Sequence, residues 1–207
     1  MKSVLCYGDS LTWGDRPDGT GRHPLPDRWP GALAARLGQG VEVVAEGLNG
    51  RTTAWDMLDG GPADRNGARH LPVALHSHAP LDLVILMLGT NDAINLRSDV
   101  YRTALGMKRL VEIALWHPYP RGLPRPQVLV VAPPRIRVCD WAGEAEVAVV
   151  DGLGAAYAQV ASEFGVAFFD AAPVALGSTV DGVHLDADVS RGLGEALAPK
   201  VAELLGV

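Results

Sequence analysis

The sequence predicts an α/β protein built on a parallel β-sheet with helices on both faces. The first observation is an alternation of about five strand-like and about five helix-like segments, a pattern typical of this fold class. The second is segment 81–88, which is apolar almost throughout, as a central parallel strand covered on both faces should be. The third is that glycines and polar residues follow several strand-like segments. In such a sheet these strand ends lie at one edge, where ligands bind.

Length and composition indicate one domain. The chain of 207 residues contains no internal repeat or linker, and we expect residues 1–207 to form a single domain. Hydrophobic residues make up 48% and charged residues 20%, which are the shares of a soluble globular protein. The net charge of −6, without a cluster of lysines, argues against a nucleic-acid partner.

The apolar segments are too short to predict a membrane protein. None approaches the about 18 uncharged residues that cross a bilayer. Asp9 and Ser10 interrupt the first apolar run, which argues against a signal peptide. We therefore expect a cytoplasmic protein with no membrane partner. Cys6 and Cys139 are too few for a disulfide framework, and we expect Cys6 to pack inside the first strand.

The first half of the chain is expected to contain two strands and two helices. Ser10 stands where the chain leaves the first strand, and the loop that follows is rich in glycine and proline and long enough to border a pocket. Asp27 is a predicted helix cap. A glycine-bearing turn follows the second strand. In order, we expect strand 2–7, loop 14–27, helix 28–37, strand 41–45, turn 46–53, loop 54–67 and helix 69–77.

The second half is expected to contain three strands and three helices. Ser98 is a predicted cap for the first of these helices, and Leu105, Leu110, Ile113 and Ala114 are its expected inward positions. Trp116 near its end is expected to be a packing residue, and a proline-rich connector follows that helix. In order, we expect strand 81–88, helix 98–117, connector 118–126, strand 127–132, helix 144–164, strand 166–170 and helix 187–205.

Three residues at the predicted ligand edge can form a nucleophilic site. A serine hydroxyl needs an imidazole to take its proton, and the imidazole needs an orienting acceptor. Among the six histidines, His184 lies in a loop at this edge, three residues after Asp181. That spacing lets a carboxylate and an imidazole turn toward each other within one tight loop. The predicted triad is Ser10, His184 and Asp181.

Such a serine also needs donors for the oxyanion that develops on the substrate. Asn91 follows the central strand and offers a side-chain amide. Gly50 offers a backbone N–H that no side chain obstructs, and the N–H of Ser10 is a third candidate. Losing one such donor typically costs about 10²–10³ in turnover.

These residues occur in four blocks that resemble those of the SGNH (GDSL) hydrolase superfamily. The blocks are Gly-Asp-Ser-Leu at 8–11, Gly50, Gly-Thr-Asn-Asp at 89–92 and Asp-Gly-Val-His at 181–184, in the order of the family and across nearly the whole chain. The resemblance implies a flavodoxin-like three-layer fold without a cofactor. It also implies Ser10 as nucleophile, His184 as base, Asp181 as its partner and an oxyanion hole of Ser10, Gly50 and Asn91.

Longer stretches around these blocks resemble the small bacterial arylesterases and acyltransferases. Members of that subgroup act on small acyl esters, some transfer acyl groups to alcohols or peroxide, and some form octamers. The resemblance therefore implies a small-molecule ester as substrate and a homo-oligomer. Leu11, Trp13 and Val183, which adjoin the triad residues, are the predicted pocket walls. The sequence leaves undecided whether Trp141 reaches the pocket or a subunit interface. Arg51 is expected to be a solvated or turn-stabilising residue and not a substrate clamp.

Three other functions remain open at this stage. A carbohydrate O-deacetylase would use the same chemistry. A metal-dependent phosphoesterase would use Asp9 and Asp92, because two carboxylates at one edge can hold Mg²⁺. A binding module would keep the fold without activity, although every triad and oxyanion position is filled. The best-supported hypothesis is a cofactor-free serine ester hydrolase with no bound metal.

Overall fold

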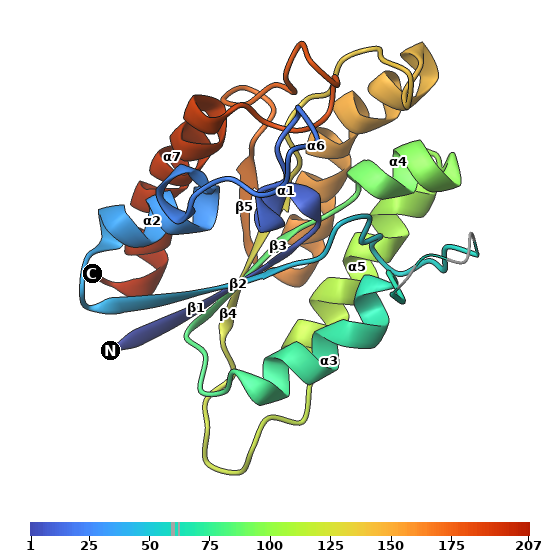
Figure 1. Ribbon diagram of the computed structural model, residues 1–207. Helices are drawn as coiled ribbons and strands as arrows, with labels where there is room; N and C mark the ends of the chain where they lie inside the picture. The colour runs from blue at the N-terminus through green and yellow to red at the C-terminus, as the bar shows by residue number, and fades with distance from the viewer. Residues whose placement is uncertain (59–60, 62) are drawn as a thin grey trace.

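The computed structural model describes residues 1–58, 61 and 63–207, and its strands form one parallel sheet. The strand order is β2-β1-β3-β4-β5, which is that of a flavodoxin-like sheet (Figure 1). This arrangement confirms the predicted fold class. The strands are β1 (Lys2–Gly8), β2 (Val41–Gly47), β3 (Leu83–Met87), β4 (Gln127–Ala132) and β5 (Ala167–Asp170).

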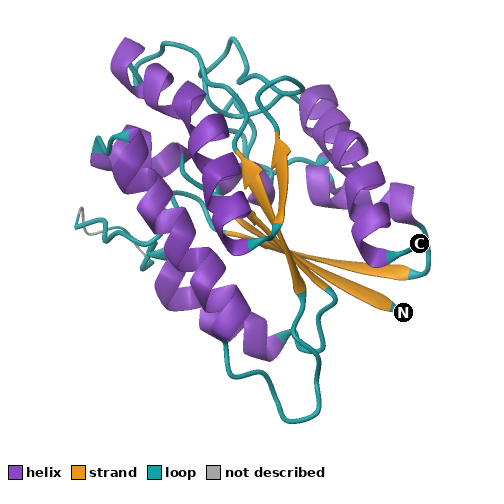
Figure 2. Ribbon diagram, turned by 180° about the vertical axis from the view of Figure 1, so that it is seen from behind, coloured by secondary structure: helices purple, strands orange, loops and turns teal. Residues whose placement is uncertain are grey.

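Helices cover both faces of the sheet. α2 (Trp29–Leu37) and α7 (Ala187–Leu205) pack on one face, and α3 (Gly67–Ser77), α5 (Val100–Trp116) and α6 (Glu144–Phe164) pack on the other. Figure 2 shows the strands running toward a group of loops at one edge. Three short helices also belong to the fold: α1 (Ser10–Trp13), α4 (Thr90–Leu96) and the 3₁₀ helix η1 (Leu25–Asp27). Among the described residues, no helix is long and apolar enough to span a bilayer.

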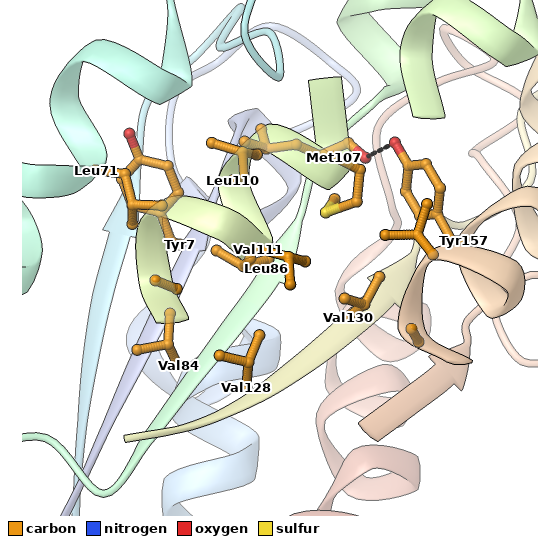
Figure 3. Packing of buried hydrophobic residues seen from close by; sticks show 14 of the residues in the cluster. Tyr7, Leu71, Val84, Leu86, Met107, Leu110, Val111, Val128, Val130 and Tyr157 are labelled. Carbon is orange, nitrogen blue, oxygen red and sulfur yellow. Dashed lines mark hydrogen bonds between the residues drawn. The ribbon is translucent and has the colours of Figure 1, made fainter. Parts of the chain in front are cut away.

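The two faces of β3 explain why its sequence is apolar without interruption. Alternate side chains of a strand point to opposite faces of a sheet. Leu83 and Ile85 join the cluster with α2 and α7. Val84 and Leu86 join the cluster with α3, α5 and α6 (Figure 3). All four are fully buried. Burial on both faces therefore requires apolar residues at every position of the strand.

Two of the predicted helix caps are wrong. The structure begins α5 at Val100, and Asp99, not Ser98, is the cap that accepts the N–H of Arg102 at 2.7 Å. Both residues have capping side chains, so the sequence could not separate them. Asp27 does not cap α2. It belongs to η1 and forms an ion pair with Arg191 of α7 at 2.5 Å.

Two predicted packing positions also differ from the structure. Leu105 is 39% exposed, because α5 turns its other apolar residues toward the sheet and α6. Trp116, which we expected to be packed inside, is 62% exposed at the end of α5 and meets only an edge of Phe164 among the described aromatic rings. Cys6, by contrast, is fully buried in β1 as predicted.

Segment 54–67 was expected to be a loop. Residues 59, 60 and 62 of this segment lie outside the described residues. The described remainder contains no helix before α3 begins at Gly67. Asn66 caps that helix by accepting the N–H of Ala68 at 3.0 Å.

The close approach of α7 to α2 makes a prediction about two glycines of one helix. A Cβ at Gly194 would lie 2.2 Å from the carbonyl oxygen of Trp29, whereas a Cβ at Gly192 would meet nothing within 4 Å. Gly194→Ala should therefore lower the free energy of unfolding by about 1–3 kcal/mol. Gly192→Ala should be neutral or should raise it by up to about 1 kcal/mol through helix propensity. Urea unfolding measures both, and equal effects would contradict the packing argument.

Candidate active site

The strand order places the carboxyl ends of β1 and β3 side by side near the centre of the sheet. β1 and β3 are neighbours, and the connections that follow them lead to opposite sides, which makes a switch point where ligands bind in open α/β sheets. Ser10 follows β1 as the first residue of α1, and Asn91 lies in the first turn of α4 after β3. The two predicted strand ends therefore meet at the switch point.

The structure brings Ser10, His184 and Asp181 into one hydrogen-bonded chain. His184 Nε2 lies 3.0 Å from Ser10 Oγ, and His184 Nδ1 lies 2.6 Å from Asp181 Oδ2. An ionised carboxylate only accepts hydrogen bonds, so the bond to Asp181 requires the proton on Nδ1. Nε2 then has a lone pair directed at the serine hydroxyl. This is the geometry that proton abstraction from a serine needs.

The loop itself holds the Asp181 carboxylate. Its other oxygen, Oδ1, accepts the backbone N–H groups of Val183 and His184, both at 2.9 Å. Gly182, between Asp181 and Val183, has φ +81°, a left-handed conformation that favours glycine. Its carbonyl accepts the N–H of Arg137 at 2.7 Å. A tight turn thus presents the acid and the imidazole of the same loop to each other.

A second carboxylate beside His184 was not predicted. Asp15 Oδ2 lies 3.7 Å from His184 Nε2 and accepts a hydrogen bond from Asn49 Nδ2 at 2.9 Å. Asp15 belongs to the loop that was expected to border a pocket. Loop residues have no periodicity that reveals their direction, so only the position of Asp15 just after Gly14 and near Ser10 pointed to it.

The three residues predicted to supply oxyanion donors, Ser10, Gly50 and Asn91, line one cavity. Asn91 Nδ2 donates to the carbonyl of Arg51 at 3.1 Å and to Asp9 Oδ2 at 3.2 Å. Asn95 Nδ2 donates to Asn91 Oδ1 at 2.9 Å, which orients the amide with its nitrogen toward β1. Gly50 lines the same cavity as Ser10 and Asn91 and has φ +78°.

Arg51 holds the second strand end against the first. It is buried, its Nη1 donates to the carbonyls of Gly8 at 2.8 Å and of Glu46, and its guanidinium lies 4.1 Å from the centroid of the Tyr7 ring. The sequence favoured a solvated or turn-stabilising role for this residue. The structure shows the turn-stabilising role, because the guanidinium links the carbonyls of Gly8 and Glu46 at the ends of two neighbouring strands.

Asp9 bonds within its own turn, whereas Asp92 bonds to a residue of a distant segment. Asp9 Oδ1 accepts the N–H of Leu11 at 3.0 Å. Asp92 accepts the N–H of Thr53 at 2.9 Å and its hydroxyl at 2.5 Å. Burial raises the pKa of Asp9 to about 6 and that of Asp92 to about 7, although these hydrogen bonds oppose the rise. With their oxygens engaged, the two carboxylates are poorly placed to hold a metal ion. Among the described residues, no group of three or more His, Cys, Asp or Glu could do so.

A cavity of about 230 Å³ opens at Ser10. Of the predicted pocket walls, Leu11 and Val183 line it, whereas Trp13 is not among its lining residues and carries the Arg22 guanidinium 4.9 Å above its ring. Trp141, whose place the sequence left undecided, lines the cavity with its ring 5.8 Å from that of His184. The remaining lining residues are Asp9, Asp15, Asn49, Gly50, Thr90, Asn91, Ile94, Asn95 and His184.

Comparison with known proteins agrees with this geometry. The sequence model of the GDSL-like lipase/acylhydrolase family matches residues 6–191. The chain belongs to this family. Membership makes the protein a carboxylic ester hydrolase and confirms the resemblance found in the four sequence blocks. No significant match was found among curated protein sequences.

Several solved structures resemble this GDSL-family chain over their whole length. A carbohydrate acetylesterase family member from Sinorhizobium meliloti is 43% identical, with a TM-score of 0.95 and 100% of both chains covered. A candidate arylesterase from Agrobacterium tumefaciens is 46% identical, with a TM-score of 0.93, 99% of this chain and 100% of that chain covered. The aryl esterase of M. smegmatis is 42% identical, with a TM-score of 0.90 and the same coverage.

The buried Asp92 carboxyl predicts how stability depends on pH. Its pKa is raised from 3.8 to about 7 in the folded protein, so the unfolded chain loses this proton first as the pH rises. Asp92 therefore favours folding at low pH, and this contribution is lost between about pH 4 and about pH 7. In Asp92→Asn, whose amide can bond to Thr53 without ionising, the free energy of unfolding should fall less over that range.

Urea unfolding at several pH values between about 4 and about 8 measures this difference. Asp140→Asn is the matched control, because it removes an exposed carboxylate outside the network and should keep the wild-type profile. A fall in Asp92→Asn as steep as that of the wild type would contradict the role given to burial.

Proposed function

We propose that the protein is a serine ester hydrolase that cleaves small acyl esters through an acyl-enzyme on Ser10. The observation that carries this proposal is the continuous chain from Ser10 Oγ to His184 Nε2 and from His184 Nδ1 to Asp181 Oδ2, with distances of 3.0 and 2.6 Å. Such a chain lets an imidazole accept a serine proton while a carboxylate stabilises the imidazolium that forms. Family membership supports the same chemistry.

In the first half of the reaction, Ser10 Oγ attacks the ester carbonyl carbon as His184 Nε2 takes the hydroxyl proton. The carbonyl π electrons move onto oxygen, which gives a tetrahedral oxyanion. When the oxyanion collapses, the bond from carbon to the alcohol oxygen breaks and His184 gives its proton to that oxygen. The alcohol leaves and the acyl group remains on Ser10.

In the second half, water or another alcohol attacks the acyl-enzyme. His184 takes the proton of the attacking group and returns it to Ser10 Oγ as the bond to serine breaks. Water yields the carboxylic acid, whereas an alcohol yields a new ester and peroxide yields a peracid. We include such acyl transfer in the proposal because any acceptor that fits the cavity beside His184 can replace water.

The oxyanion hole that we propose consists of the Ser10 and Gly50 N–H groups and the Asn91 side chain. Asn91 Nδ2 makes two long bonds, at 3.1 and 3.2 Å, and the longer one, to Asp9, is the one that an oxyanion would replace. The fixed position of Asn91 on α4 supports this role, since preorganised donors stabilise charge without reorganisation.

The size of the cavity and the structural neighbours support small substrates. About 230 Å³ suits a short acyl chain with a compact alcohol better than a lipid. The similar structures include aryl esterases and a carbohydrate acetylesterase family member. Small acyl esters are therefore our first proposal, and a carbohydrate O-deacetylase of the same mechanism is the second. Trp13, outside the cavity lining, is not required by either.

Three wider proposals accompany this function. A single domain over 1–207 is supported by a family match that covers most of the chain and by neighbours of equal length. A cytoplasmic location follows from the sequence argument. A homo-oligomer, with the octamer as the first form to test, rests on the resemblance to the small bacterial arylesterases and acyltransferases.

The triad predicts how single substitutions change esterase activity. On p-nitrophenyl esters from acetate to octanoate, kcat/KM should fall as the acyl chain outgrows the cavity. Ser10→Ala and His184→Ala should each lose at least about a thousandfold in kcat, because both groups take part in bond making. Asp181→Asn should lose less than either, since it orients His184 without reacting.

EDTA should leave the wild-type rate unchanged. Activity that persists in Ser10→Ala but disappears with EDTA would contradict the serine mechanism and support a metal-dependent mechanism instead. Ser3→Ala, on β1 far from the cavity lining, is a matched control that should keep wild-type activity.

A further inference from the structure

Asp15 places a carboxylate beside the proposed triad that the triad does not use. Its Oδ2 lies 3.7 Å from His184 Nε2, the nitrogen that faces Ser10. Asp15 lines the same cavity and its side chain is 24% exposed, so a ligand in the cavity can reach it. The carboxylate therefore faces the space in which the reacting groups would meet.

The surrounding residues fix the position of this carboxylate. The N–H of Asp15 donates to the carbonyl of Ser10 at 3.0 Å, and Asp15 pairs with Arg22 across an isolated bridge. Asn49 Nδ2 donates to Oδ2 at 2.9 Å. A carboxylate has about four acceptor positions, and the bond from Asn49 occupies one of them. The side chain is thus held in place with acceptor capacity that remains for a ligand.

In the proposed reaction, the alcohol leaves from a position close to Asp15. When the acyl-enzyme forms, His184 Nε2 donates its proton to the oxygen of the departing alcohol. That oxygen must then lie within hydrogen-bond distance of Nε2, and Asp15 Oδ2 is 3.7 Å from the same nitrogen. A hydroxyl on the adjacent carbon of the alcohol would lie within reach of the carboxylate.

We propose that Asp15, held by Asn49, accepts a hydrogen bond from a hydroxyl next to the scissile ester. The preferred substrates are then acyl esters of neutral polyols, such as partially acylated sugars. Trp141, which lines the same cavity, offers an apolar surface for their carbon skeleton. This inference rests on the proposed serine mechanism, because that mechanism fixes where the alcohol leaves. A hydrogen bond to a charged acceptor corresponds to a preference of about 10- to 100-fold.

Asp15 has one other plausible role, which is to stabilise the imidazolium form of His184. That role would act on every ester alike, because the imidazolium forms whatever the alcohol is. Recognition of a hydroxyl acts only on esters that carry one. Two esters that share an acyl group and differ only in hydroxyls therefore separate the two roles.

The experiment compares glycerol monoacetate with propyl acetate, which share the acetyl group and the three-carbon chain. In the wild type, kcat/KM should be about 10- to 100-fold higher for glycerol monoacetate. Asp15→Ala removes the acceptor and should abolish most of this preference. Asp18→Asn is the control, because it removes a carboxylate from an exposed position of the same loop and should keep the preference.

Several results would overturn the inference. One is a wild type that does not prefer glycerol monoacetate. Another is an Asp15→Ala variant in which both esters slow by the same factor, which would assign Asp15 to His184 alone. A strong preference for acetylcholine over glycerol monoacetate would show that the carboxylate recognises positive charge instead. Activity that survives in Ser10→Ala would instead contradict the serine mechanism. The role of Asp15 would then be contradicted too, because it rests on that mechanism.

Discussion

The site depends on a buried polar network that joins the ends of the first three strands. Arg51 donates to the carbonyls of Gly8 and Glu46, at the ends of β1 and β2, and Asn91 of α4 donates to the carbonyl of Arg51. Buried polar groups are costly unless they are paired, so these bonds admit few alternative arrangements. The network therefore sets the distance between Ser10 and Asn91, which come from different strands.

The same network buries two carboxyl groups, and their burial lowers the stability of the protein at neutral pH. Asp9 and Asp92 are almost wholly buried, and their pKa values rise to about 6 and about 7 because burial disfavours the charged form. Asp92 nevertheless holds Thr53, and with it the segment that carries Gly50 and Arg51, against α4. The buried carboxyls therefore lower the free energy of unfolding at neutral pH, while their hydrogen bonds hold the groups around the cavity in place.

Much of the fold was predictable because its elements have strong local signals. The uninterrupted apolar run of β3 and the long helices α6 and α7 appear in the structure close to their predicted bounds. Short helices were missed because α1 and α4, of four and seven residues, are too brief to show periodicity. The cap of α5 was misplaced because Ser98 and Asp99 offer similar capping chemistry. The cap of α2 was misplaced because Asp27 belongs to η1 and pairs with Arg191, which is distant in sequence.

The sequence by itself determined the parallel sheet and predicted that Ser10, His184 and Asp181 would lie together, since strand ends, tight turns and residue types are local properties. Only the tertiary structure decided what else faces Ser10. Asp15, Asn49 and Trp141 line the cavity, whereas Trp13, the nearest tryptophan in sequence, lies outside its lining. The direction of a loop side chain depends on contacts between distant segments, such as the bond from Asn49 to Asp15, and no local pattern records them.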